Sequence, residues 1–165
     1  MPSKFGFTPG DILGRDTRSW SLVYRWFTHA FVHSSFLHVL FNMMFLVGVG
    51  KQIERIMGTC AFLVLVATMI ATCSIVLVAA EMLTWVVLSP GRLVEGNLVG
   101  FSGVLFGLFT LFALHQPREV VFNMWGLDVP APWAPVALLL IQTVLFPSAS
   151  FVGHASGMVA GAAYR

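Results

Sequence analysis

The sequence predicts an all-α, polytopic membrane helix bundle, and three observations support that fold class. Hydrophobic residues make up 58% of the 165 positions and charged residues only 10%, whereas an average soluble domain is about 25% charged. The mean hydropathy is +0.86. The apolar residues also gather in long runs without charge. A water-soluble protein of this composition would expose large apolar patches, so we expect one lipid-embedded domain over residues 1–165.

Long charge-free runs mark the expected helices. These runs cover residues 34–50, 59–80, 97–114 and 129–164. A membrane helix needs roughly 17–25 residues, so the last run is too long for one helix. Pro147 and the serines after it are typical of a turn. We therefore divide that run into helices near Pro135–Phe146 and Ser150–Tyr164, which gives about five transmembrane helices in total.

Charged linkers separate the runs, and a polar segment precedes them. The linkers are Lys51–Gly58, Glu81–Gly96 and His115–Asp128. We expect a surface helix over Glu81–Leu88 in the middle linker, with Trp85 at the membrane interface. The first segment, Met1–Arg25, has no long apolar stretch and predicts a polar loop at the membrane surface. Basic residues fall on both sides of the predicted bundle, so charge alone does not orient the chain.

Two polar residues share one face of the first predicted helix. His38 and Asn42 lie four residues apart, so a helix places them one turn apart on the same side. A polar side chain in hydrocarbon is costly and must face protein or water. An interhelical hydrogen bond that holds the bundle together is the simpler explanation for one such residue. The presence of two on one face favours a site.

Ser102 begins the third predicted helix within Gly100-Phe101-Ser102-Gly103. A helix N-terminus has free backbone N–H groups and the positive end of the helix dipole. Both suit a nucleophile whose substrate develops an oxyanion. An N-cap serine is a common alternative, and this short motif alone does not separate the two.

His154 lies within the last predicted helix, where a buried histidine bonded to a carbonyl is the simpler explanation. An ionisable group inside a membrane is nevertheless a functional candidate. Small-xxx-small glycine patterns link the two helices: Gly103 and Gly107 in one, Gly153, Gly157 and Gly161 in the other. Such faces allow close helix packing, which would bring the Ser102 hydroxyl within reach of the His154 imidazole.

A serine beside a histidine is the arrangement for general-base activation of a nucleophile. No carboxylate lies within an apolar run, so the sequence predicts a Ser102–His154 dyad and not a triad. His38, Asn42 and the Ser102 backbone N–H would then form the oxyanion hole.

Several other site classes are disfavoured. The scattered basic residues form no stripe of the kind that nucleic-acid binding requires. Cys60 and Cys73 both fall in one apolar run and are expected to be packing thiols. His29 and His33 lie four apart, but no HExxH motif accompanies them. We expect these histidines to cap the helix start and to bond the preceding loop, and we expect neither a metal nor a cofactor.

The ordered set of motifs resembles the rhomboid family of intramembrane proteases over roughly residues 24–165. The stretch Phe27–His33, followed by His38 and Asn42, is similar to the family's second-helix motif. Tyr24-Arg25 takes the place of its Trp-Arg pair. Gly100–Gly103 is similar to its GxSG motif, and Gly153–Gly161 to its last-helix motif.

The resemblance implies an enzyme that cleaves transmembrane protein substrates in the bilayer, with Ser102 as nucleophile and His154 as base. By the same transfer, His38 and Asn42 join the oxyanion hole. Phe106 stands where many members have a tyrosine that stacks on the histidine. The remaining matched positions are supporting residues: Arg25, His33, Gly100, Gly103, Gly157 and Gly161.

The resemblance also implies an orientation and exposes a departure. The site would open to the lumenal or extracellular side, which makes residues 1–33 a lumenal loop region and residues 34–165 the transmembrane bundle. The family core has six helices, and no helix precedes the loop in this sequence. We therefore expect a fragment or a form that lacks the first core helix.

Two further function classes stay open. A catalytically inactive rhomboid-like protein would bind membrane clients without cutting them, although both dyad residues are retained. A small transporter or channel is more distant, because no charged residue lies within a predicted transmembrane helix. The sequence predicts a multi-pass integral membrane protein but does not distinguish endomembranes from a plasma or inner membrane. It does not identify the substrate or the oligomeric state.

Overall fold

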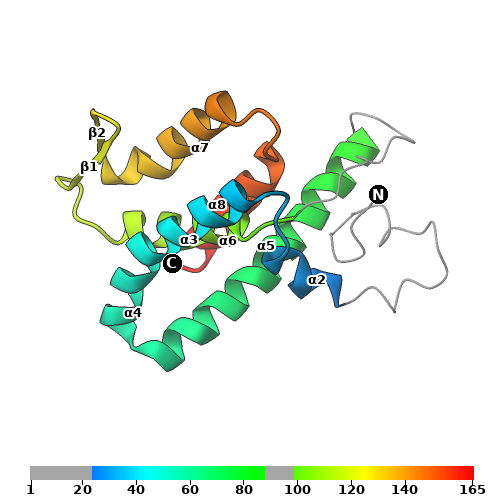
Figure 1. The fold of residues 1–165 in the computed structure, drawn as a ribbon, viewed down its shortest axis with the longest axis horizontal. Coiled ribbons are helices and arrows are strands. Elements are labelled where there is room, and N and C mark those ends of the chain that lie inside the picture. Colours follow the sequence, from blue (N-terminus) through cyan, green and yellow to red (C-terminus); the bar gives the residue numbers. More distant parts are fainter. Residues whose placement is uncertain (1–23, 88–98) are drawn as a thin grey trace.

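The computed structural model describes residues 24–87 and 99–165. Most of the predicted N-terminal loop and the segment 88–98 lie outside the described residues, as does the side chain of Trp85. Within these described residues, the regular elements are helices and one short hairpin (Figure 1). The elements are α2 (Arg25–Thr28), η2 (His29–Phe31), α3 (Phe36–Phe45), η3 (Leu46–Gly50), α4 (Lys51–Met57), α5 (Thr59–Val87), α6 (Ser102–Leu114), β1 (Val121–Met124), β2 (Leu127–Pro130), η4 (Ala131–Trp133), α7 (Ala134–Leu145) and α8 (Phe151–Ala163).

The first predicted helix is longer than expected. Helix α3 passes through the π-helical turn η3 directly into α4, so a single 22-residue helical segment covers Phe36–Met57. The expected linker Lys51–Gly58 is thus helical up to Met57, and the prediction of a linker there is wrong. The segment ends at Gly58, whose φ of 83° is a left-handed conformation that glycine adopts without strain.

Helix α5 crosses the whole bundle (Figure 1). It runs for 29 residues without interruption, which corresponds to about 43 Å at 1.5 Å per residue. The predicted boundary at Ala80 is therefore wrong, because Glu81 and the residues up to Val87 continue the same helix. Its apolar part and the Phe36–Met57 segment are the two helices of the described chain that are long enough to span a membrane.

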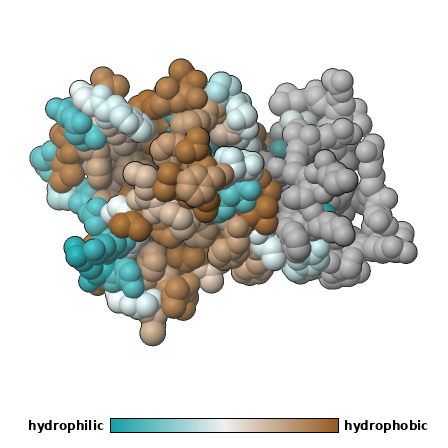
Figure 2. Space-filling model, in the orientation of Figure 1, coloured by the Kyte–Doolittle hydropathy of each residue, from teal (hydrophilic) through white to brown (hydrophobic). Residues whose placement is uncertain are grey.

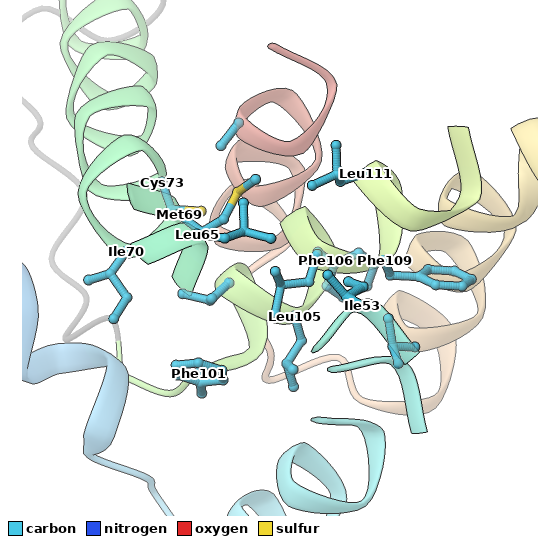
Figure 3. Close-up of a cluster of buried hydrophobic side chains, with 14 of the residues drawn as sticks. Ile53, Leu65, Met69, Ile70, Cys73, Phe101, Leu105, Phe106, Phe109 and Leu111 are labelled. Atoms are coloured by element: carbon cyan, nitrogen blue, oxygen red, sulfur yellow. The ribbon is translucent and has the colours of Figure 1, made fainter. Parts of the chain in front are cut away.

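Helices α6 and α8 pack backbone to backbone at the centre of the bundle. A Cβ atom added at Gly157 would overlap the carbonyl of Gly103, and one added at Gly161 would overlap that of Gly107. The predicted close packing of the two glycine faces is confirmed by these contacts. Around this crossing, the side chains labelled on α5 and α6 point into one apolar cluster (Figure 3), which includes Leu65, Met69 and Phe106.

The linker after α6 contains a hairpin that the sequence analysis missed. Strands β1 and β2 are antiparallel, with Val121 opposite Pro130. The turn places Trp125 at φ 52° and Gly126 at φ 87°, the backbone that a tight two-residue hairpin turn requires. Phe122 fixes the hairpin to the bundle, because its ring packs 5.5 Å from that of Phe109 on α6.

The last two helices confirm the division of the fourth apolar run. Helix α7 begins at Ala134 with Pro135 in its first turn, a position that needs no backbone donor. Helix α8 follows a turn, and the Ser150 hydroxyl accepts a 3.0 Å hydrogen bond from the Gly153 N–H. The two helices have 12 and 13 residues, fewer than the roughly 20 of a typical membrane span.

The outer surface of the bundle is apolar. Figure 2 shows hydrophobic residues over most of the described part of one face. Many large apolar side chains of the described residues are exposed, such as Phe36 at 76%, Ile56 at 78% and Val144 at 77%. Such a surface would drive aggregation in water and suits lipid contact. The predicted fold class, a helical membrane bundle, is confirmed.

Candidate active site

Ser102 and His154 meet at the crossing of α6 and α8. The Ser102 Oγ lies 2.9 Å from the His154 Nε2, although the two residues are 52 positions apart in the sequence. His154 is buried, with 5% of its surface exposed. The glycine contacts explain the short distance, because side chains between the helices would push the two backbones apart. The geometry is that of a hydroxyl and the base that can accept its proton.

The loop before α6 sets the direction of the Ser102 side chain. Gly100 has φ 114°, and Phe101 is the N-cap residue, so Ser102 is the first residue of the helix. Its backbone N–H is one of those that an α-helix leaves without an internal partner. The Ser102 N–H and Oγ thus lie together at the N-terminal, positive end of the helix dipole.

Phe106 packs against one face of the His154 ring. The two rings stack with centroids 4.6 Å apart and an interplanar angle of 22°. The stacking expected at this position is present. Among residues 24–87 and 99–165, no carboxylate is hydrogen-bonded to the His154 ring. The imidazole is therefore oriented by packing and by Ser102, an arrangement that fits a dyad.

His38 lies against the loop that carries Ser102. A Cβ atom added at Gly100 would be 2.6 Å from His38 Cε1 and 2.7 Å from its Nε2. The Cε1–Nε2 edge of the ring therefore faces the backbone at Gly100, two residues before Ser102. We call this Gly100–Phe101 stretch the nucleophile loop, after the role expected of Ser102. A glycine is required at position 100 both by this contact and by its positive φ.

Asn42 lies one turn below His38 and is buried, with 5% exposure. Its Nδ2 has no hydrogen-bond acceptor among the described residues. A buried amide donor without a partner is costly, and such a group is suited to a ligand or an intermediate that brings an acceptor. The oxyanion-hole roles of His38 and Asn42 stay predictions.

His29 has a partner that was not predicted. Its Nε2 lies 3.0 Å from the Ser74 Oγ of α5, in a buried position. Its backbone carbonyl accepts a 2.9 Å hydrogen bond from the Gly100 N–H. His29 thus connects α5 to the nucleophile loop. Ser74 was missed, and the available signal was a serine inside an apolar run.

Two supporting residues lie near these elements. Arg25 is the first residue of α2. The His33 ring meets the His38 ring edge-on, with centroids 5.0 Å apart. The roles implied for Arg25 and His33 are not decided by these positions and stay predictions.

The amino-acid sequence is similar to those of proteins in one known family. Residues 21–165 match the family model described as a rhomboid domain. Rhomboid-like protein 15 of Arabidopsis thaliana is 33% identical over 96% of this chain and 38% of its own length. Rhomboid-type serine protease 2 of Yarrowia lipolytica is 29% identical over 79% of this chain and 42% of its own. Rhomboid protease GlpG of Yersinia pseudotuberculosis is also 29% identical, over 84% and 46%.

The chain thus spans less than half the length of these relatives. The family match covers every residue of the Ser102–His154 pair, the nucleophile loop and the His38–Asn42 face. With an apolar outer surface and two helices long enough to span a bilayer, the chain is a membrane protein, and it belongs to the rhomboid family.

Proposed function

We propose that this chain is the catalytic region of a multi-pass intramembrane serine endopeptidase that cleaves transmembrane protein substrates. The 2.9 Å separation of Ser102 Oγ and His154 Nε2 is the observation that carries this proposal. A buried histidine beside a serine at a helix N-terminus is the arrangement in which the hydroxyl can be activated as a nucleophile.

In the first step, Ser102 Oγ attacks the carbonyl carbon of the scissile peptide bond while its proton passes to His154 Nε2. The tetrahedral intermediate carries its negative charge on the former carbonyl oxygen. When the C–N bond breaks, the imidazolium of His154 returns the proton to the leaving amine. This leaves an acyl group on Ser102, which a water molecule then releases with His154 again acting as base.

The oxyanion would be stabilised by donors on two sides. The Ser102 N–H belongs to the N-terminus of α6, and the unpartnered Asn42 Nδ2 supplies a buried donor from α3. His38 Nε2 faces the same loop. Each donor of this kind typically contributes about 10²–10³-fold to kcat.

Phe106 takes over part of what a carboxylate does in a triad. Its ring stacks on His154 and so restricts imidazole rotation without adding charge. A full triad would also stabilise the imidazolium electrostatically. We therefore expect a modest kcat. Substrate positioning by the bilayer would then supply much of the selectivity.

The experiment that tests this proposal compares cleavage of a transmembrane substrate by the full-length wild-type protein and by its Ser102→Ala variant. Because the nucleophile is removed, we expect a loss of about 10⁴-fold or more. Ser156→Ala is the matched control, since it removes a buried serine hydroxyl only two residues after His154 in α8. Cleavage that survives Ser102→Ala would contradict the proposal. Capture of uncleaved clients by the wild-type protein would favour the inactive rhomboid-like alternative.

A further inference from the structure

The His38 ring has a different neighbour at each of its nitrogens. Its Nδ1 lies 3.1 Å from the Oγ of Ser34. Its Cε1–Nε2 edge lies against Gly100 in the nucleophile loop. The two nitrogens of an imidazole are distinct, and the hydrogen bond at one of them determines whether the other carries the proton. The contact at Nδ1 therefore decides what His38 presents to the loop.

Two hydrogen-bond directions are possible, with opposite consequences for an oxyanion. If the Ser34 hydroxyl donates to Nδ1, the neutral ring keeps its proton on Nε2, which then faces Gly100 as a donor. If Nδ1 donates to Ser34, Nε2 turns a lone pair toward the loop and would repel the negative oxygen. Only the first direction makes His38 useful at the site.

We propose that Ser34 is a positioning residue of the oxyanion hole, whose hydroxyl donates to His38 Nδ1 and so keeps the donor proton on Nε2. This role rests on the proposed protease function. Ser34 does not touch the reacting atoms and acts entirely through the His38 ring.

The same contact also fixes which way the ring faces. A 180° flip of the imidazole would replace Nδ1 with the carbon Cδ2 opposite Ser34 and exchange Nε2 for Cε1 at Gly100. The flip would break the 3.1 Å hydrogen bond. The His33 ring, edge-on to His38, packs on the ring but does not distinguish the two orientations by hydrogen bonding. The selection therefore depends on Ser34.

The neighbouring serine has a separate task and provides a matched control. Ser35 is the N-cap of α3, and its hydroxyl accepts a 3.2 Å hydrogen bond from the His38 backbone N–H. It supports the helix start but makes no bond to the ring. Loss of Ser35 should therefore affect helix stability without affecting the His38 tautomer.

The experiment measures the tautomer directly, by ¹⁵N NMR of histidine-labelled full-length protein in nanodiscs, with the His38 signal assigned through its loss in His38→Gln. In the wild type we expect the proton on Nε2. In Ser34→Ala we expect the Nδ1-protonated form to become populated, Ser34→Thr to restore the wild-type signal, and Ser35→Ala to leave it unchanged.

Kinetics on the same variants complete the test. We expect Ser34→Ala to lower kcat about three- to tenfold with little change in KM, less than the loss of a direct donor. Three results would each overturn the role of Ser34. They are a proton on Nδ1 in the wild type, an unchanged tautomer in Ser34→Ala, and a shifted tautomer in Ser34→Ala with unchanged kcat. If the wild type has no protease activity, the proposed function fails by itself, and the tautomer spectra still decide the hydrogen-bond direction.

Discussion

The two sides of the candidate site are built in different ways. The Ser102–His154 side lies between α6 and α8, where glycine backbones touch and most residues of α6 are buried. The His38 side lies at the start of α3, where Ser34 and Phe36 are exposed. Ser102 and His154 are therefore held by helix packing, whereas the His38 ring is held by the short-range contact with Ser34 and the edge-on contact with His33.

Because of this contrast, we expect substitutions on the two sides to affect stability and activity differently. A change at the α6–α8 crossing should damage fold and activity together, because the packing that stabilises the bundle also sets the dyad distance. A change near His38 should damage activity more than stability, because few contacts of the core depend on it. Each of the following substitutions tests one side of that difference.

Gly157→Ala should have the largest effect. The added methyl group would overlap the backbone of Gly103, and backbone cannot move aside as a flexible side chain can. We expect a loss of about 1–3 kcal/mol or more of stability together with loss of cleavage, measured by thermal unfolding and by a substrate assay. Gly48→Ala is the control, since nothing lies within 4 Å of that position. Equal stability of the two variants would show that the helix crossing is not tight.

Gly100→Ala should come next and act mainly on activity. The methyl group would lie 2.6–2.7 Å from the His38 ring, displacing its Nε2, and the φ of 114° disfavours any side chain. We expect kcat to fall about 10²-fold or more, with a smaller change in unfolding temperature than Gly157→Ala produces. An unfolding temperature lowered as far as that of Gly157→Ala would remove the proposed difference between the two sides.

Ser74→Ala should have the smallest effect and tests the connection between the two sides. The change removes the hydroxyl that lies 3.0 Å from the buried His29 Nε2, and a single hydrogen bond typically contributes about 0.5–1.5 kcal/mol to stability. Thr68→Ala on the same helix is the control, because its hydroxyl bonds only the Val64 carbonyl one turn away. If both variants unfold at the wild-type temperature, His29 does not anchor the nucleophile loop to α5.

Much of the packed side could be predicted from the sequence, because its determinants are local patterns. Glycines spaced for one helix face predicted the α6–α8 crossing, and charge-free runs predicted which segments are apolar. The division at Pro147 held because proline and serine carry turn chemistry. These features depend on residue type and spacing, and they need no knowledge of distant partners.

The features that were not predicted depend on helix continuation, on an unusual turn residue and on contacts between distant residues. Charged residues mark where an apolar run ends, but the helix continues past that point, as it does from Gly50 into Lys51 and from Ala80 into Glu81. The hairpin turn uses Trp125 at a positive φ, where Asn or Gly is the usual signal. The partner of His29 lies 45 residues away in α5, beyond any local pattern.

Covalent labelling of Ser102 tests most directly whether Ser102 and His154 act as a catalytic dyad. The full-length protein in nanodiscs would be treated with a serine-reactive fluorophosphonate, and the labelled peptide identified by mass spectrometry. We expect labelling of Ser102 in the wild type and its loss in His154→Ala, because a base at His154, 2.9 Å away, would activate the hydroxyl. Labelling confined to another serine, labelling that survives His154→Ala, or no labelling of the folded protein would contradict a Ser102–His154 dyad.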